Sequence, residues 1–348
     1  MEKIEKNKEL WEKIFLSRYN DGDQNGMIDD LSDSYIWQGS YGMAYKKPQL
    51  VNGVPIDKLF KEFASGFSDI SIDHNMLGEG DLLASHFTVT ATHTGNYFGI
   101  PPTGKIISFF GTAIAKFDSD GKLVHEWELW DEIILLRQLG LLADGSSGNL
   151  IATEKIPTSK PEVKYPAATL LPAESLLHKQ DKGAVKTRDP TVARNIAQWE
   201  RFLAIKYQTR DFDLLDKVMA PNYQWHGSCG FGWDMSDPET RKAILDGFSK
   251  QTEGINDYQF TYRLFGEGHF IVYHIVCEYT QTASLINIDA TGRKVRHSNI
   301  SVCQFDGEGR IMEEWETIDI LAVYKQLGVI PNTSEITSIA QYLNTTNE

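Results

Sequence analysis

Residues 126–140 read EWELWDEIILLRQLG, and residues 314–328 read EWETIDILAVYKQLG. Both stretches contain Glu-Trp-Glu, an aspartate three residues later and a closing Gln-Leu-Gly, with each match 188 positions apart. The same offset relates further pairs: Trp11-Glu12 and Trp199-Glu200, Tyr35-Ile-Trp37-Gln-Gly39-Ser40 and Tyr223-Gln-Trp225-His-Gly227-Ser228, Gly78-Glu79-Gly80 and Gly266-Glu267-Gly268, and Phe117-Asp118 and Phe305-Asp306. A constant offset over so many pairs indicates that the chain contains two copies of one unit.

Each copy has the size of a domain rather than of a solenoid repeat. We predict a first domain at residues 5–142 and a second at 192–330, with a linker at 143–191 and a tail at 331–348. The linker contains Asp-Gly-Ser-Ser-Gly and several prolines, which is typical of an extended segment, and one short helix is expected at 172–179.

Each copy begins with helical patterns and continues with strand patterns. Apolar residues recur at helical spacing at the start of both copies, in Leu10, Trp11, Ile14 and Phe15 and in Trp199, Phe202 and Leu203. Further helices are expected at 56–66, 133–139, 240–250 and 321–327, and strands at 81–93, 105–117 and 123–131. Helices followed by an antiparallel meander predict the α+β class, with the sheet curled around the helices and a pocket between them.

Composition excludes several classes of partner. The chain has 348 residues, with 34 Lys and Arg against 48 Asp and Glu, and a net charge of −14. This balance argues against nucleic-acid partners and anionic membrane surfaces. Apolar runs are too short for a membrane span, and the charged N-terminal residues are not expected to form a signal peptide. Three cysteines without a C-x-x-C motif fit reduced thiols in a cytoplasmic protein.

Three motifs in copy one carry a family resemblance. Thr92-His93-Thr94-Gly95 leads to Pro101-Pro102-Thr103-Gly104-Lys105, Asp120-Gly121-Lys122 precedes the Glu-Trp-Glu stretch, and Gln138-Leu139-Gly140 closes it. This pattern resembles the SnoaL-like polyketide cyclase branch of the nuclear transport factor 2-like (NTF2-like) superfamily. The resemblance implies a cone-shaped α+β barrel in each copy. Because relatives commonly pair through their sheets, it also implies an intramolecular pseudo-dimer.

The resemblance implies chemistry without a metal or an organic cofactor. Some members close rings by intramolecular aldol chemistry, whereas others in the superfamily are isomerases, dehydratases, epoxide hydrolases or non-catalytic binding domains, so the fold alone does not select an activity. Asp131 matches the acid/base aspartate of the branch, and a carboxylate in an apolar pocket can remove a proton beside a carbonyl. The alternative for Asp131 is a helix N-cap, because it directly precedes the apolar run at 133–136.

His93 shares a strand face with Phe87 and Val89, where a neutral imidazole could polarise a carbonyl. The alternative is a structural histidine that holds the turn after it. Copy two departs from the family pattern here, because Gln281 stands at the position of His93. Asp319 repeats Asp131 and is therefore a further catalytic candidate.

Aromatic and polar residues supply the candidate ligand-binding set. Strand phase places Trp127 on the face of Asp131, and Trp37 and Trp225 occupy matched segments that we expect to line the cavities, or else to be plain core. Copy two adds polar residues that copy one lacks, and these are either pocket residues or a polar sheet surface where the copies meet. The complete set is Trp37, Trp127, Trp225, His226, His297, Asn299 and Trp315.

Residues 21–29 read DGDQNGMID, which matches the first positions of an EF-hand calcium loop. Asp21, Asp23 and Asn25 would supply the ligands, but Ser32 stands where the loop requires a bidentate glutamate. An acidic turn between helices is the other reading. No other metal or cofactor is expected, since no cluster of His and Cys has zinc spacing.

These observations predict a cofactor-independent acid/base enzyme of the polyketide cyclase or isomerase type, acting on a small apolar carbonyl compound. Asp131 would be the base and His93 its assistant, which places the reaction in copy one. The alternative is a protein that binds a small hydrophobic molecule without converting it. Self-association beyond the intramolecular pair is left open.

Overall fold

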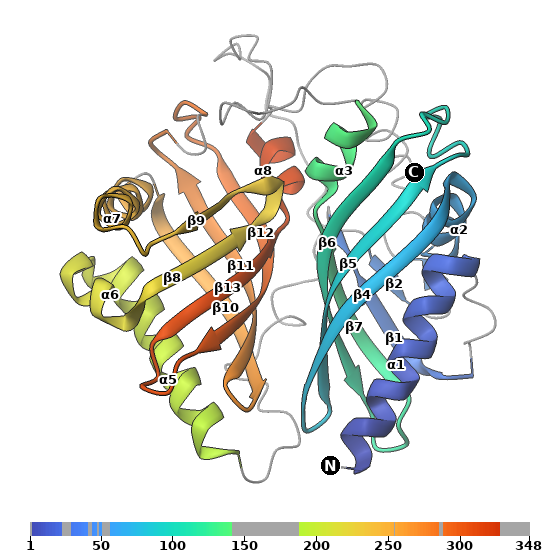
Figure 1. Ribbon diagram of the computed structural model, residues 1–348, viewed down its shortest axis with the longest axis horizontal. Coiled ribbons are helices and arrows are strands. Elements are labelled where there is room, and N and C mark those ends of the chain that lie inside the picture. Colours follow the sequence, from blue (N-terminus) through green and yellow to red (C-terminus); the bar gives the residue numbers. More distant parts are fainter. Residues whose placement is uncertain are drawn as a thin grey trace.

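The computed structural model describes residues 2–22, 29–40, 44–46, 49–50, 56–140, 188–253, 255–284 and 288–327. They form two units in which helices cover the outer face of a sheet, and the two sheets face each other in the middle of the molecule (Figure 1). The helix expected at 172–179 and the tail at 331–348 lie outside the described residues.

The first unit contains a seven-stranded sheet in the order β3-β2-β1-β7-β6-β5-β4. Strands β4 to β7 form an antiparallel meander, whereas β1 pairs in parallel with β7. Its elements are α1 (Glu2–Asp21), β1 (Leu31–Gln38), β2 (Ala44–Lys46), β3 (Gln49–Leu50), α2 (Ile56–Gly66), β4 (Phe67–Glu79), β5 (Leu82–His93), β6 (Ile106–Phe117), β7 (Leu123–Trp130) and α3 (Glu132–Leu139).

The second unit repeats this arrangement in a six-stranded sheet, β10-β11-β12-β13-β8-β9, with β8 parallel to β13. Its helices are α5 (Pro190–Ala204), the π-helical turn η3 (Ile205–Thr209), α6 (Phe212–Val218), the 3₁₀ turn η4 (Ser228–Gly230), α7 (Pro238–Glu253) and α8 (Ile320–Leu327). Its strands are β8 (Met219–Gly227), β9 (Gly232–Asp234), β10 (Ile255–Glu267), β11 (Phe270–Gln281), β12 (Lys294–Phe305) and β13 (Ile311–Ile318).

The α+β class predicted from the sequence is confirmed, and so is the meander of β5, β6 and β7. The structure adds strands that the pattern did not reveal, among them β1, β4 and their counterparts β8 and β10. Along β4, half-buried and exposed residues alternate, because this strand lies at the edge of the sheet. An edge strand that buries little apolar surface gives only a weak hydrophobic signal.

Local capping residues end the elements at defined positions. In the turn between β6 and β7, the Asp118 carboxylate accepts the backbone N–H groups of Asp120 and Lys122, both at 2.9 Å. Gly121 follows with a φ of 81°, a left-handed conformation that glycine adopts without strain. Gly140 closes α3 in the same way, with a φ of 87°.

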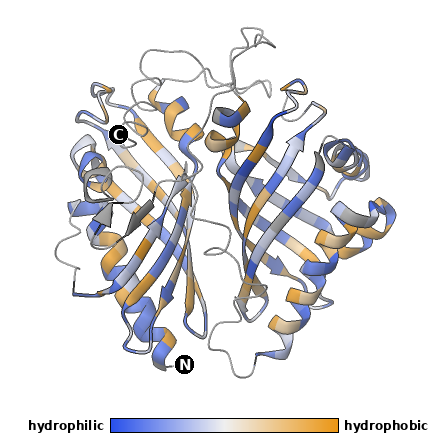
Figure 2. Cartoon of the chain, turned by 180° about the vertical axis from the view of Figure 1, so that it is seen from behind, coloured by the Kyte–Doolittle hydropathy of each residue, from blue (hydrophilic) through white to orange (hydrophobic). Residues whose placement is uncertain are grey.

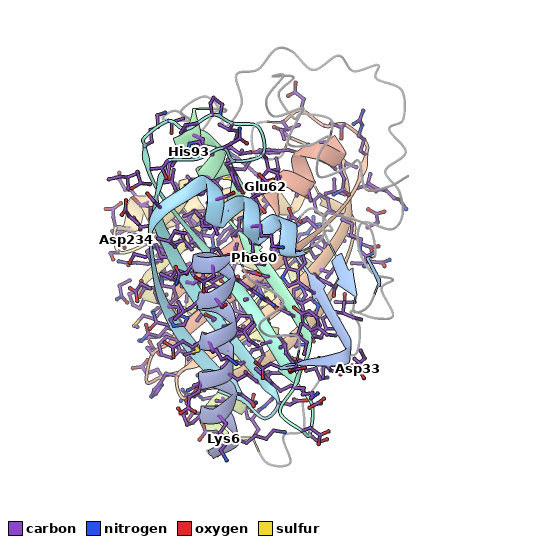
Figure 3. The ribbon with its side chains drawn as sticks, turned by 90° about the vertical axis from the view of Figure 1, so that its right-hand side faces the viewer. Lys6, Asp33, Phe60, Glu62, His93 and Asp234 are labelled. Carbon is purple, nitrogen blue, oxygen red and sulfur yellow. The ribbon has the colours of Figure 1, made fainter. Side chains whose placement is uncertain are left out.

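Helices α1 and α2 lie across the outer face of the first sheet (Figure 3). Trp11, Ile14 and Phe15 of α1 and Phe60 and Phe63 of α2 are buried there. In the second unit, α5 and α7 occupy the corresponding place (Figure 1). Burying these apolar faces against the sheet gives each unit its own core. None of the described helices is long and apolar enough to cross a membrane.

The inner faces of the two sheets pack against each other through a second apolar cluster. Hydrophobic and hydrophilic residues are interspersed along these strands (Figure 2). The buried members of the cluster come from both units and are Leu82, Ala84, Ile114, Trp127, Leu129, Phe265, Val272, Ile300 and Val302. Each sheet is therefore buried on both faces, once in its own unit and once against the other unit.

The contacts across this interface are reciprocal. The backbone N–H of Gly78 donates to the Glu267 carboxylate at 2.8 Å, and that of Gly266 donates to the Glu79 carboxylate at 3.0 Å. Ring pairs repeat the symmetry: Trp127 lies 5.8 Å from His274, and Trp315 lies 6.2 Å from His86. Pairs that exchange partners in this way define a two-fold relation, so the predicted pseudo-dimer is confirmed.

Candidate functional site

The two units share one scaffold but differ in how their interiors are filled. In the first unit, four buried phenylalanines occupy the space between helices and sheet, and Phe15 and Phe87 are 4.7 Å apart between ring centroids. In the second unit, the residues 188 positions later are all smaller or polar, and all of them line a cavity. The pairs are Phe15 and Leu203, Phe63 and Gln251, Phe87 and Ile275, and Phe109 and His297.

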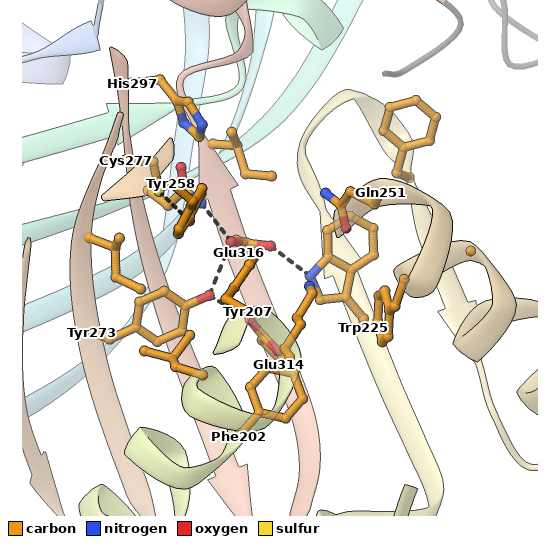
Figure 4. Close-up of a pocket in the computed structure, with 18 of the residues that line it drawn as sticks. Phe202, Tyr207, Trp225, Gln251, Tyr258, Tyr273, Cys277, His297, Glu314 and Glu316 are labelled. Atoms are coloured by element: carbon orange, nitrogen blue, oxygen red, sulfur yellow. Dashed lines mark hydrogen bonds between the residues drawn. The ribbon is translucent and has the colours of Figure 1, made fainter. Parts of the chain in front are cut away.

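This cavity in the second unit has a volume of about 440 Å³, which suits a small molecule. It lies between α5, η3, α7 and the strands β8, β11, β12 and β13 (Figure 4). Eleven of its 25 lining residues are aromatic, namely Trp199, Phe202, Tyr207, Tyr223, Trp225, Phe231, Trp233, Phe248, Tyr258, Tyr273 and Tyr279. A flat aromatic or alicyclic molecule would find matching surfaces on several sides.

Two carboxylates project into this aromatic space from β13. Glu314 and Glu316 are two residues apart and therefore point to the same face of the strand. Glu314 accepts the hydroxyl groups of Tyr223 at 2.7 Å and Tyr273 at 2.6 Å. Glu316 accepts the indole N–H of Trp225 at 3.0 Å and the Tyr273 hydroxyl at 3.1 Å (Figure 4). These donors fix both carboxylates against the cavity.

Lys206 is the cation of this site. It belongs to η3 and lines the cavity with its ammonium group 4.2 Å from the ring centroid of Phe248 and 5.3 Å from that of Tyr207. Burial lowers the pKa of this amine, while the charges of Glu316 and Glu314 oppose the shift. In the first unit the corresponding residue is Arg18.

The cavity also contains polar atoms without partners. The Asn299 amide N–H donates to Glu316 at 2.9 Å, but its Oδ1 has no hydrogen-bond partner among the described residues. The same holds for Nδ1 of His297, a residue that is 8% exposed. Because buried polar atoms are normally satisfied, these two atoms are suited to contact a polar group on a ligand.

Burial shifts the protonation equilibria inside the cavity. Burial, together with the neighbouring charge of Glu316, raises the pKa of Glu314 to about 7. Burial lowers the pKa of His297 to about 4, so its imidazole is neutral at neutral pH. The site therefore combines a carboxyl group that titrates near neutrality with a neutral imidazole and an amine of lowered pKa.

The first unit holds the same acid pair in a filled core. Arg18 is completely buried and binds Glu126 at 2.6 Å and the Tyr35 hydroxyl at 2.9 Å. Glu128 accepts the Trp37 indole N–H at 3.0 Å, and burial, followed by the charge of Glu126, raises its pKa to about 8. Trp37 is thus a core residue that anchors this network.

The candidates from sequence fall into three places, the first of which is the cavity. Trp225, His297 and Asn299 line it together. The second place is the interface. Trp127 and Trp315 project from β7 and β13 toward the other unit, and His226 lies beside Trp315, where it binds Glu313 at 2.9 Å. Period-two alternation puts the glutamates on the cavity side of these strands and the tryptophans on the opposite side.

The third place is the end of each sheet. Asp131 caps α3 by accepting the N–H of Ile134 at 3.1 Å, and its other oxygen accepts the N–H of Cys229 from the second unit. Asp319 caps α8 by accepting the N–H of Ala322 at 3.1 Å. Asp131 therefore forms the helix N-cap that was the alternative to catalysis, and Asp319 forms the equivalent cap in the second unit. The acid/base role of Asp131 and Asp319 stays a prediction.

His93 ends β5 and is fully buried (Figure 3). Its Nδ1 lies 3.0 Å from the Thr103 hydroxyl, and no hydrogen bond joins it to Asp131 within the described parts of the chain. Gln281 has the corresponding contact in the second unit, where its Oε1 accepts a hydrogen bond from the Thr291 hydroxyl at 2.6 Å. Both side chains hold the loop that follows the strand, and the catalytic role of His93 stays a prediction.

The calcium motif is only partly visible. Asp21 is the last residue of α1, whereas Asp23 and Asn25 lie outside the described residues. Over the described ranges, no group of three or more His, Cys, Asp or Glu side chains is arranged to hold a metal ion.

Sequence reasoning missed Lys206, Glu314 and Glu316 as members of one site. The available signal was the comparison of the two copies at constant offset. Lysine replaces arginine at position 206, and smaller or polar residues replace phenylalanine at the positions paired above. Replacing several phenylalanines of one core by smaller side chains indicates a cavity, but only if those positions are known to lie next to one another in the folded unit.

The chain is similar to known proteins over both units. The family model of the SnoaL-like polyketide cyclases matches residues 55–139 and 197–327. No curated protein gives a significant match. Among solved structures, AclR, a putative hydroxylase from Streptomyces galilaeus, is 27% identical, with 40% of this chain and 99% of that chain covered and a TM-score of 0.34.

Two further structures are similar at lower identity. A putative SnoaL-like polyketide cyclase from a Jannaschia species is 17% identical, with 42% of this chain and 99% of that chain covered and a TM-score of 0.37. An LEH-like epoxide hydrolase from M. tuberculosis is 14% identical, with coverage of 44% and 96% and a TM-score of 0.32. Because the family model matches in both units and spans most of the chain, this protein belongs to the SnoaL-like polyketide cyclase family, with two copies of the fold in tandem.

Proposed function

We propose that the cavity of the second unit binds a small, largely apolar carbonyl compound and catalyses proton transfer at the carbon beside the carbonyl, without a cofactor. One observation carries the proposal: an aromatic cavity of about 440 Å³ in which carboxylates, an amine and a neutral imidazole converge. Such a proton transfer begins both an aldol ring closure and an isomerisation.

The roles follow from the contacts. Glu316 is the proposed base, because its carboxylate lines the cavity beside Asn299 and His297. The unpartnered Nδ1 of His297 can donate to the carbonyl oxygen in the tautomer that carries the proton there. The aromatic wall excludes water, and in such a site a hydrogen-bond donor at the carbonyl oxygen stabilises the negative charge of the forming enolate more strongly than it would in water. Glu314, with a pKa of about 7, can return the proton at neutral pH.

The test uses 4-phenylbutan-2-one as the probe. Quenching of tryptophan fluorescence measures its binding, since Trp199, Trp225 and Trp233 line the cavity. Mass spectrometry measures the uptake of deuterium from D₂O beside the carbonyl. We expect Glu316→Gln to retain binding and to lower the exchange rate by roughly 10²–10⁴-fold, the usual contribution of a general base.

The first unit supplies the matched control. Glu128 is the counterpart of Glu316 and lies in a filled core, so Glu128→Gln should leave both binding and exchange unchanged. Exchange that persists unchanged in Glu316→Gln would exclude Glu316 as the base.

A specific observation also favours a second candidate, a binding protein without turnover. The oxygens of Glu314 and Glu316 are already held by tyrosine, tryptophan and asparagine donors, much as Glu126 and Glu128 are held in the first unit. In that case the probe binds the wild-type protein, and its exchange rate equals the rate in buffer.

A further inference from the structure

Lys206 has an unusual environment for a lysine. Its amine lies among the rings of Phe202, Tyr207 and Phe248, at 5.9, 5.3 and 4.2 Å from their centroids. It makes no hydrogen bond and no ion pair within 4.0 Å to any of the residues described. Burial among these rings lowers the pKa of the Lys206 amine, while the charges of Glu316 and Glu314 oppose the shift. A lowered pKa increases the share of the neutral, nucleophilic amine.

The first unit shows that the scaffold does not require this arrangement. At the same position Arg18 is completely buried, ion-paired with Glu126 at 2.6 Å and bonded to Tyr35 at 2.9 Å. A guanidinium group held in this way serves as a structural cation and is not a nucleophile. In the second unit, the residue that replaces it borders a cavity and carries a primary amine instead.

We infer that Lys206 is a nucleophile that condenses with the carbonyl group of the ligand to form an iminium ion in the cavity. This inference rests on the proposed function, because it assumes that the cavity admits a carbonyl compound. It adds to that function an intermediate in which the ligand is covalently bonded to Lys206.

The condensation balances without any further reactant. The lone pair of the neutral Nζ forms a bond to the carbonyl carbon, the C=O π electrons move to oxygen, and the oxygen takes up a proton to give a carbinolamine. Nitrogen loses one proton, and the protonated hydroxyl leaves as water when the nitrogen lone pair forms the C=N bond. One ketone, one amine and one proton thus give one iminium ion and one water.

The two glutamates are placed for these proton transfers. Glu314, whose pKa is about 7, can protonate the departing hydroxyl group. The positive iminium nitrogen then acidifies the neighbouring C–H, and the Glu316 carboxylate in the same cavity can remove that proton. The product is an enamine, whose nucleophilic carbon can attack a second carbonyl group. Hydrolysis of the resulting iminium releases Lys206.

Reductive trapping tests the inference. The full-length protein is incubated with 4-phenylbutan-2-one and sodium cyanoborohydride, which reduces an iminium ion to a stable secondary amine. Trypsin does not cut after a modified lysine, so modified Lys206 yields the peptide 202–210 with the added mass, in place of two fragments. We expect this adduct to dominate the wild-type digest, and to be lost in Lys206→Arg and Lys206→Met.

Lys217→Arg is the matched control, because Lys217 is an exposed lysine on α6 of the same unit. This variant should keep the adduct on Lys206. Since the adduct is mapped on the wild-type protein, the result does not depend on whether the Lys206 variants fold.

The outcomes separate this inference from the proposed function. Binding and deuterium exchange without an adduct on Lys206 would overturn the inference and leave the proposed function standing. Adducts spread evenly over exposed lysines would overturn it as well. A probe that neither binds nor exchanges would remove the proposed function, and the inference with it. An adduct on Lys206 without exchange would support the inference while contradicting the proton-transfer step of the function.

Discussion

Asp131 combines a local role with a contact between the units. One oxygen caps α3 and the other accepts a backbone N–H of the second unit. Burial raises its pKa from 3.8 to about 6, against the opposing effect of the backbone N–H groups of Ile134 and Cys229. The folded protein therefore binds this proton more tightly than the unfolded chain does. The protonated Asp131 therefore adds its full contribution to the free energy of unfolding below about pH 4, and this contribution is lost as the pH rises through about 6.

We expect Asp131→Ala to lower the free energy of unfolding by about 1–3 kcal/mol, since it removes a helix cap and an acceptor for a buried N–H. The loss of stability that Asp131 causes between pH 4 and 6 should also be absent from the variant. Urea unfolding at several pH values measures both effects. If the variant keeps its stability but loses exchange of the ketone, the capping account is wrong and the acid/base prediction for Asp131 holds.

At the scale of the element, β11 and β12 decide whether a unit has a cavity. In β6 of the first unit, a Cβ at Gly111 would collide with the ring of Phe87 on β5. In the second unit Ile275 replaces that phenylalanine, and the position of Gly111 holds Asn299. Gly111 therefore leaves the space that the Phe87 ring occupies. In the second unit the smaller Ile275 leaves room for the side chain of Asn299.

This coupling predicts how to close the cavity. The combined change of Ile275→Phe, His297→Phe and Asn299→Gly restores the first unit's residues together. We expect a folded protein whose affinity for 4-phenylbutan-2-one falls by at least tenfold, or about 1.4 kcal/mol, because the rings occupy the ligand's space. Fluorescence titration and thermal unfolding measure affinity and stability. As a control, Phe109→His in the first unit should lower stability and leave ligand affinity unchanged.

At the scale of the whole molecule, the sheet interface joins the two units. Trp127 is 3% exposed, lies in the interface cluster and has the Arg263 guanidinium 3.6 Å above its ring. Removing a buried tryptophan of this kind typically costs about 3–5 kcal/mol. We expect Trp127→Ala to lose this amount and to split a single calorimetric transition into two, because the units no longer stabilise each other.

The matched control is Ile106→Ala, which truncates a side chain that is 72% exposed. It should change stability by less than about 0.5 kcal/mol, as is usual for exposed positions. A single, unshifted transition in Trp127→Ala would mean that the interface contributes little to stability.

Several features of the whole molecule could be predicted from sequence because they depend on local patterns. The constant offset revealed two copies, and strand alternation predicted β5, β6 and β7. The face that each strand turns toward the cavity could not be predicted in this way. Trp127 and Leu129 have the apolar character expected of a core, but they lie in the interface, while Glu126 and Glu128 lie inside the unit. A sheet that is buried on both faces shows apolar residues on either side, so alternation does not identify the inner one.

The sequence by itself determined the duplication, the α+β class and the order of the meander, since each follows from periodicity and turn residues over a few neighbours. Only the tertiary structure decided which unit contains a cavity and which groups share it. Lys206, Gln251, Ile275, His297 and Glu316 come from five different elements, and no short stretch of sequence records their convergence. An open cavity depends on the summed volume of side chains brought together by the fold, and that sum exists only in three dimensions.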